Sequence, residues 1–153
     1  MKRFSLRLII TFCALCITSA YSTVFAKNLF PELADRSDVE KVYISPMAIK
    51  MAGNYVDFST SLLPQTGSML PEIKSLHVYT CETKEGVAAA SKAIDRYIKE
   101  NPWYEVIMST EDDEDTTTIY GIPSQSEEGK CESMIIRVQD GNTDMTIVVI
   151  NAK

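Results

Sequence analysis

The side chains that most often carry out catalysis are scarce in this chain. His77 is the only histidine among the 153 residues, so a multi-histidine zinc site cannot form. Cys81 follows four residues later, in a segment whose pattern predicts a β-strand. A strand rises about 3.3 Å per residue, which separates the two Cα atoms by about 13 Å. His77 is therefore too far from Cys81 to activate its thiol, and we predict no nucleophile–base pair.

Cys81 and Cys131 are the two cysteines that remain once the first 26 residues are set aside. With 49 residues between them they cannot form a closely spaced metal knuckle. Compartments outside the cytoplasm favour disulfides, and each cysteine lies at one end of a predicted strand. Two alternatives remain open at this point, a Cys81–Cys131 disulfide and two free, buried thiols.

A run of acidic residues is the most conspicuous polar motif. It consists of Glu111, Asp112, Asp113, Glu114 and Asp115. A calcium-binding EF-hand loop alternates its ligands around a central glycine and ends in a distal glutamate, and this run has neither feature. We therefore predict a solvated hairpin turn, which could steer a basic partner toward the protein.

Other motifs with a defined chemistry are lacking. The chain has no glycine-rich phosphate loop and no G-x-S-x-G nucleophile elbow. Carboxylates such as Asp95 and Glu100 could perform hydrolysis only across a cleft, which leaves a small carboxylate-dependent hydrolase as the alternative function. We predict no catalytic residue, no metal site and no cofactor.

The first 26 residues have the three parts of a secretory signal peptide. The basic residues are Lys2, Arg3 and Arg7. An apolar run over residues 8–20 follows, and the segment ends in Val24-Phe25-Ala26. The run of about 13 residues is shorter than the roughly 20 that a membrane-spanning helix needs. We predict cleavage after Ala26, and no membrane span after processing.

Processing makes the chain strongly acidic. Removing three of the 15 basic residues leaves 12 against 21 acidic ones, a net charge of −9. Nucleic acid would be repelled by this charge, so we exclude it as a partner.

The pattern of apolar and turn residues predicts one domain. Residues 27–38 are expected to form a loose leader, and residues 39–153 a single folded domain. Strands are predicted at 39–44, 73–81, 103–110, 116–122, 131–139 and 145–151. Ser45-Pro46 begins a helix over 46–60, on which Met47 and Met51 belong to the buried face, and Thr83 caps a helix over 84–99. Asp140-Gly141-Asn142 predicts a hairpin turn.

This element order predicts an α+β fold of two layers. A mostly antiparallel sheet of five to six strands is expected to have both helices on one face. The strands at the end of the chain are expected to leave an edge of the sheet free.

Several segments resemble a known family. They are Val42-Tyr43-Ile44-Ser45-Pro46-Met47, the strand Trp103-Tyr104-Glu105-Val106-Ile107-Met108 and the terminal Thr146-Ile147-Val148-Val149-Ile150. Residues 39–151 are similar to a family of uncharacterised small secreted proteins of Gram-negative anaerobes, a domain of unknown function. The chain departs from it in ending Asn151-Ala152 where the family more often has glycine. The resemblance implies a compact α/β domain in the cell envelope and supplies no catalytic residue.

These observations together favour a secreted, periplasmic or outer-envelope protein that is not an enzyme. Its expected role is to bind a protein partner in the envelope through a free sheet edge and the acidic turn 111–115.

Overall fold

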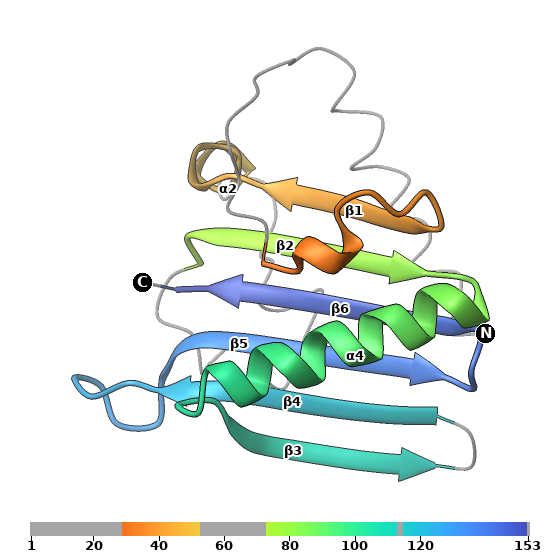
Figure 1. The fold of residues 1–153 in the computed structure, drawn as a ribbon. Helices are drawn as coiled ribbons and strands as arrows, with labels where there is room; N and C mark the ends of the chain where they lie inside the picture. The colour runs from red at the N-terminus through yellow and green to blue at the C-terminus, as the bar shows by residue number, and fades with distance from the viewer. Residues whose placement is uncertain (1–28, 53–72, 113–114, 153) are drawn as a thin grey trace.

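The computed structural model describes residues 29–52, 73–112 and 115–152 (Figure 1). Its elements in chain order are η1 (Pro31–Leu33), β1 (Val39–Ile44), α2 (Pro46–Ala52), β2 (Ser75–Cys81), α4 (Lys84–Glu100), β3 (Glu105–Asp112), β4 (Asp115–Pro123), β5 (Cys131–Asp140) and β6 (Asp144–Asn151). Six antiparallel strands and two α-helices confirm the predicted α+β fold.

The six strands form one sheet in the order β1-β2-β6-β5-β4-β3. Hairpins join β3 to β4, β4 to β5 and β5 to β6. The last hairpin turns at Gly141, whose φ of 59° is the left-handed conformation that glycine adopts without strain. β6 then pairs with β2, which places the last strand inside the sheet.

Helix α4 begins where the sequence predicts. Thr83 has an extended backbone, and its hydroxyl oxygen accepts a hydrogen bond of 2.9 Å from the Gly86 amide. The cap is itself held, because the Thr83 hydroxyl donates to the Asp38 carboxylate at 2.9 Å. Ala90 and Ile94 face the sheet and are fully buried, whereas Lys92 and Asp95 are exposed. Tyr97 is only half-buried.

The segment expected to be a loose leader is part of the core. Phe30 and Leu33 have no exposed surface, and the Phe30 ring packs edge-on against Tyr79 at 5.0 Å and Tyr97 at 5.4 Å. Lys41 of β1 donates to the carbonyl oxygens of Leu33 and Ala34, which fixes the end of η1. The prediction for residues 29–38 was wrong because Leu29, Phe30 and Leu33 follow no regular period, although they pack into the core and Phe30 lies between α4 and β2.

Both faces of the sheet carry an apolar cluster, since side chains alternate along each strand. On the α4 face, the central strands contribute Ile135, Met145, Ile147 and Val149. The opposite face has a second cluster, made of Leu76, Ile119, Cys131, Met134, Ile136, Ile150 and Ala152. The sheet is therefore buried on both faces in its central strands.

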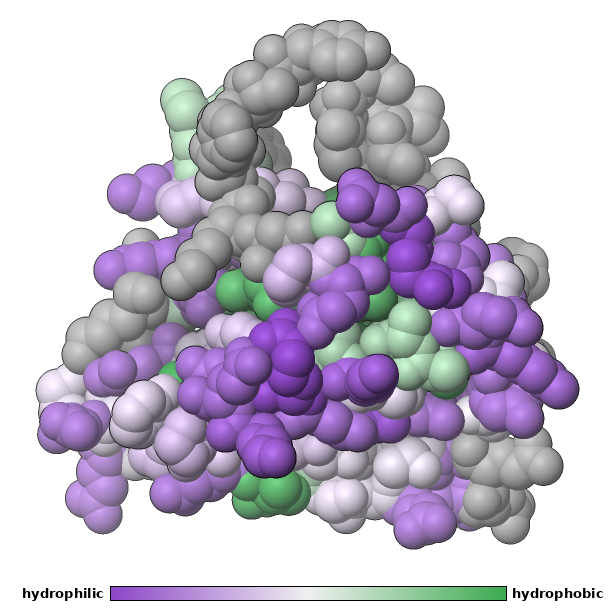
Figure 2. Space-filling model, in the orientation of Figure 1, coloured by the Kyte–Doolittle hydropathy of each residue, from purple (hydrophilic) through white to green (hydrophobic). Residues whose placement is uncertain are grey.

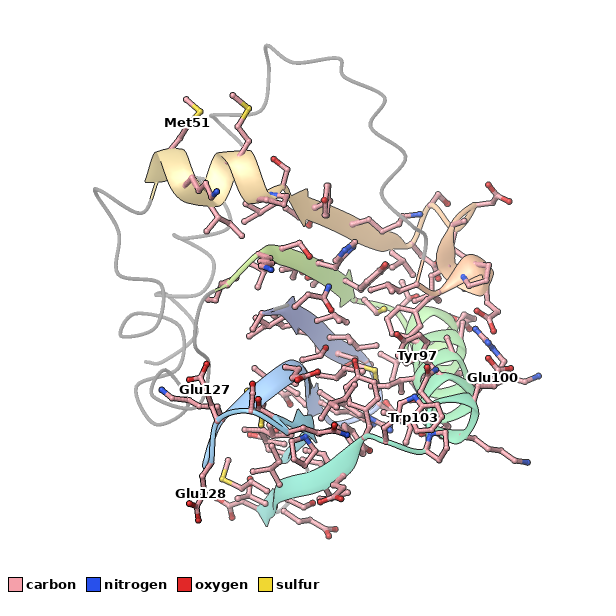
Figure 3. All side chains as sticks on the ribbon, turned by 90° about the vertical axis from the view of Figure 1, so that its left-hand side faces the viewer. Met51, Tyr97, Glu100, Trp103, Glu127 and Glu128 are labelled. Atoms are coloured by element: carbon pink, nitrogen blue, oxygen red, sulfur yellow. The ribbon has the colours of Figure 1, made fainter. Side chains whose placement is uncertain are left out.

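Helix α2 does not lie where the sequence predicted. It follows the end of β1 at the margin of the sheet, whereas α4 crosses the sheet face (Figure 1). Met47 and Met51 are exposed, at 72% and 68%, and Figure 3 shows Met51 pointing away from the sheet. The helical spacing of the two methionines predicts a buried helix face. This prediction is wrong because β1, the strand before α2, is an edge strand, and α2 therefore lies beside the sheet and not over its face. Residues 53–60 of the predicted helix lie outside the described residues.

Within the described parts of the chain, no helix combines the length and the apolar character needed to cross a membrane.

Candidate interaction surface

The sheet has two edges, formed by β1 and β3. The expectation that the terminal strands would leave an edge free is therefore wrong for β6, which lies between β2 and β5. The non-local pairing of β6 with β2 could not be predicted from local patterns. The free edge of the C-terminal half is instead β3, which pairs with β4 on one side only.

Strand β3 is exposed along its whole length. All eight of its residues are exposed, including Val106 at 60%, with Ile107 and Met108 each at 37%. Trp103, two residues before the strand, is 64% exposed. Figure 2 shows apolar atoms at the lower margin of the molecule, where β3 lies, on a face that is otherwise mostly hydrophilic. Apolar side chains gathered on an exposed edge strand are typical of an interaction surface.

We call this region the β3 edge surface. It comprises Trp103, Glu105, Val106, Ile107, Met108, Glu111 and Asp112. The cross-strand partners show how its side chains divide between the two faces. Met108 pairs with Ile119, whose side chain belongs to the cluster opposite α4, whereas Val106 pairs with Tyr120, which packs on the α4 side.

The start of β3 is anchored by Tyr104, which points inward while its neighbour Trp103 is exposed. The Tyr104 hydroxyl lies 2.7 Å from the Ser133 Oγ, and Ser133 donates to the carbonyl oxygen of Ile150 at 3.1 Å. Burial raises the pKa of Tyr104 to about 12, so its hydroxyl stays protonated near neutral pH. Trp103 lies where the end of α4 turns into β3 (Figure 3). The buried tyrosine thus fixes the position from which the exposed tryptophan projects.

A bulge at Ile107 marks the middle of the strand. The register shifts between Val106 and Met108, and the side chain of Ile107 lies over Gly121 of β4. A β-carbon at Gly121 would stand 3.0 Å from the Cys131 Sγ and still closer to the Ile107 side chain, so any larger residue here would have to displace Ile107. Sequence reasoning missed Gly121, although a glycine inside a strand pattern is a signal for close approach.

The predicted acidic turn is largely strand. Glu111 and Asp112 end β3, and Asp115 begins β4 and pairs with Asp112. Residues 113 and 114 lie outside the described residues. Within the described part of the chain, no group of three or more histidine, cysteine, aspartate or glutamate side chains could hold a metal ion. The acids that belong to β3 extend the β3 edge surface at its far end.

The two cysteines lie far apart. Cys81 of β2 pairs with Met145 of β6, which in turn pairs with Gln139 of β5. Cys131 begins β5 eight residues before Gln139, so the two cysteines are separated by roughly 25 Å along the strand direction. Their side chains also belong to the clusters on opposite faces, and both are free and buried. A disulfide needs Cα atoms within about 7 Å, so the disulfide alternative is excluded.

The remaining candidates for chemistry are structural. His77 is 8% exposed and packs against Tyr43, with ring centres 4.6 Å apart; burial lowers its pKa. Asp95 pairs with Arg137 and Glu100 with Arg96 on the surface of α4. The two carboxylates are thus already engaged by arginines. Glu100 ends α4 three residues before Trp103, whereas His77 lies on β2 and Asp95 in the C-terminal half of α4.

Most of the chain matches the model of a known protein family. The model described as a domain of unknown function (DUF4252) matches residues 32–153. The chain belongs to the DUF4252 family. No curated protein and no solved structure significantly matches this DUF4252 protein. The match begins at Glu32, inside η1, which agrees with the packing of that segment into the core.

Proposed function

We propose that this DUF4252 protein is a non-catalytic envelope protein of Gram-negative anaerobes that binds a protein partner through the β3 edge surface. The observation that supports it is the edge strand itself, which is exposed over eight residues and has apolar side chains at its centre. The signal-peptide pattern of residues 1–26 supports a periplasmic or outer-envelope location.

An edge strand has a row of backbone N–H and C=O groups without a strand partner, and such groups can pair with another chain. Proteins usually protect an edge with lysine, proline, bulges or a cover. β3 has the bulge at Ile107 but neither lysine nor proline in its sequence. At about 3.4 Å per residue the strand is roughly 27 Å long, which is enough for a bound segment to add as a further strand.

Site-specific photo-crosslinking tests this proposal in the cells that make the protein. A photoreactive amino acid replaces Val106 in one variant and Ala88, exposed on α4, in the matched control. We expect a discrete protein adduct from position 106 and none from position 88. Equal adducts at both positions, or none at 106, would contradict the proposal. Turnover in a hydrolase screen that survives purification would instead support the carboxylate-dependent hydrolase.

A further inference from the structure

Acidic residues stand at both ends of β3, and its apolar residues lie between them. Glu105 begins the strand and Glu111 and Asp112 end it, while Val106, Ile107 and Met108 lie between. Pairing with β4 places Glu105, Met108 and Asp112 on the face opposite α4, and Val106 and Glu111 on the α4 face. Each face of the edge therefore has an apolar side chain and at least one acid near the strand end.

This arrangement argues against a second copy as the occupant. If the two-fold axis of an antiparallel pair of β3 strands passed between Met108 and Ser109, Glu105 of each copy would lie opposite Asp112 of the other. If the axis passed through Met108, Glu105 of each copy would lie opposite Glu111 of the other. A parallel copy in register would place each acid beside its own equivalent. Like charges opposite each other on neighbouring strands are destabilising, so self-pairing along the whole of β3 is disfavoured, whereas antiparallel copies shifted to pair only residues 105–110 or 105–109 avoid these contacts.

We propose, building on the proposed function, that the occupant of the β3 edge is an extended segment of a different protein, with an apolar centre flanked by basic residues. Such a segment adds a seventh strand beside β3. Its backbone pairs with the free edge, its central side chains cover Val106 and Met108, and its basic ends lie beside Glu105, Glu111 and Asp112. Opposite charges on neighbouring strands stabilise this pairing, and salt weakens it.

The chain has its own optical probe for this event. Trp103 is the single tryptophan, it is 64% exposed, and it lies two residues before β3. A segment that covers the start of the strand removes water from the indole. Trp103 emission should therefore shift to shorter wavelength on binding.

The test uses the natively processed protein and three blocked nine-residue peptides. The basic probe is Lys-Lys-Thr-Val-Thr-Val-Thr-Lys-Lys. In the second peptide glutamate replaces every lysine, and in the third proline replaces both valines, which keeps the charge and prevents strand pairing. We expect the basic probe to bind with a shift of Trp103 emission, and at least about tenfold more tightly than either of the other two.

Matched variants locate the binding. Glu105→Gln, Glu111→Gln and Asp112→Asn together should weaken the basic probe about tenfold at low salt. The control is a second triple variant that changes the net charge by the same amount, in exposed residues near the β1 edge: Asp35→Asn, Glu40→Gln and Glu82→Gln. Its affinity for the basic probe should stay within about twofold of that of the unchanged protein.

Three results would overturn the inference. The first is equal binding of the basic and proline peptides, which would show attraction by charge without strand pairing. The second is equal weakening by both triple variants. The third is a dimer in sedimentation analysis that the β3 variant abolishes. Failure of all peptides while position 106 still crosslinks a partner would overturn the peptide class and leave the proposed function intact.

Discussion

Tyr104 and Ser133 show how a single buried contact can position an exposed surface. Ser133→Ala would leave the Tyr104 hydroxyl without its 2.7 Å partner, at a cost of about 1–3 kcal/mol in unfolding free energy. Tyr104→Phe should cost less, about 0.5–1.5 kcal/mol, because Ser133 still donates to the Ile150 carbonyl. Urea unfolding of both variants measures the difference. A double variant should cost less than the sum, since the two residues share one contact.

The same tyrosine predicts a loss of stability at alkaline pH. Its pKa is raised from 10.0 to about 12, mainly by burial, so the fold favours the neutral phenol. Burial of the neutral Tyr104 phenol contributes its full share to the free energy of unfolding below pH 10, and this contribution is lost as the pH rises through 12. The urea midpoint should therefore fall between pH 10 and 12, and fall less in Tyr104→Phe. An equal fall in both proteins would assign the effect to other buried groups, such as Cys81, whose pKa burial raises to about 11.

The free thiols give a separate residue-scale prediction. Cys81 and Cys131 are buried, and burial raises the pKa of both thiols, which keeps them protonated and unreactive. The unreduced, processed native protein should react slowly with a thiol reagent at pH 8, and the same protein denatured should show two free thiols, since Cys13 and Cys16 are removed with residues 1–26. A reductant should leave the melting temperature unchanged. A count of zero thiols before reduction would contradict the structure.

At the scale of elements, α4 holds one face of the sheet through a narrow apolar stripe. Ile94 has no exposed surface, so Ile94→Ala should destabilise the protein by about 2–5 kcal/mol. Lys92→Ala is the matched control on the exposed side of the same helix and should change stability by less than about 0.5 kcal/mol. Denaturant unfolding measures both. A loss for Ile94→Ala no larger than that of the control would mean that α4 does not pack here.

Local signals in the sequence predicted this helix well, because its determinants are local. Thr83 caps it, Asn101 ends it, and the apolar spacing matches the helical period. The strand β1 was likewise predicted at residues 39–44. The exposed edge could not be predicted in the same way. The pattern of β3 resembles that of a buried strand, and its exposure follows from its place in the sheet, which depends on the pairing of β6 with β2.

At the scale of the whole molecule, the sheet order decides which segments are accessible. The insertion of β6 buries the most apolar strand of the chain and moves β3 to the margin. The acids at the two ends of β3 disfavour self-pairing along the whole strand, and under the proposal made above they favour a basic segment on this edge.

Processing is the last whole-molecule prediction. We expect the natively exported protein to begin at Lys27, because the signal-peptide pattern ends at Ala26. The structure also indicates how far downstream the cleavage site can lie without removing core residues. Leu29 packs against the core and Phe30 is fully buried against Tyr79 and Tyr97, so cleavage after Ala26 leaves only Lys27 and Asn28 ahead of these residues.

Intact mass spectrometry of the protein from its own cells measures the first residue. A mass that includes residues 1–26 would contradict the predicted cleavage. A start beyond Phe30 would remove one of the aromatic rings that joins the N-terminal segment to α4 and β2. Phe30→Ala in the Lys27 form should therefore lower the free energy of unfolding by about 3–5 kcal/mol, which measures what such a truncation would cost.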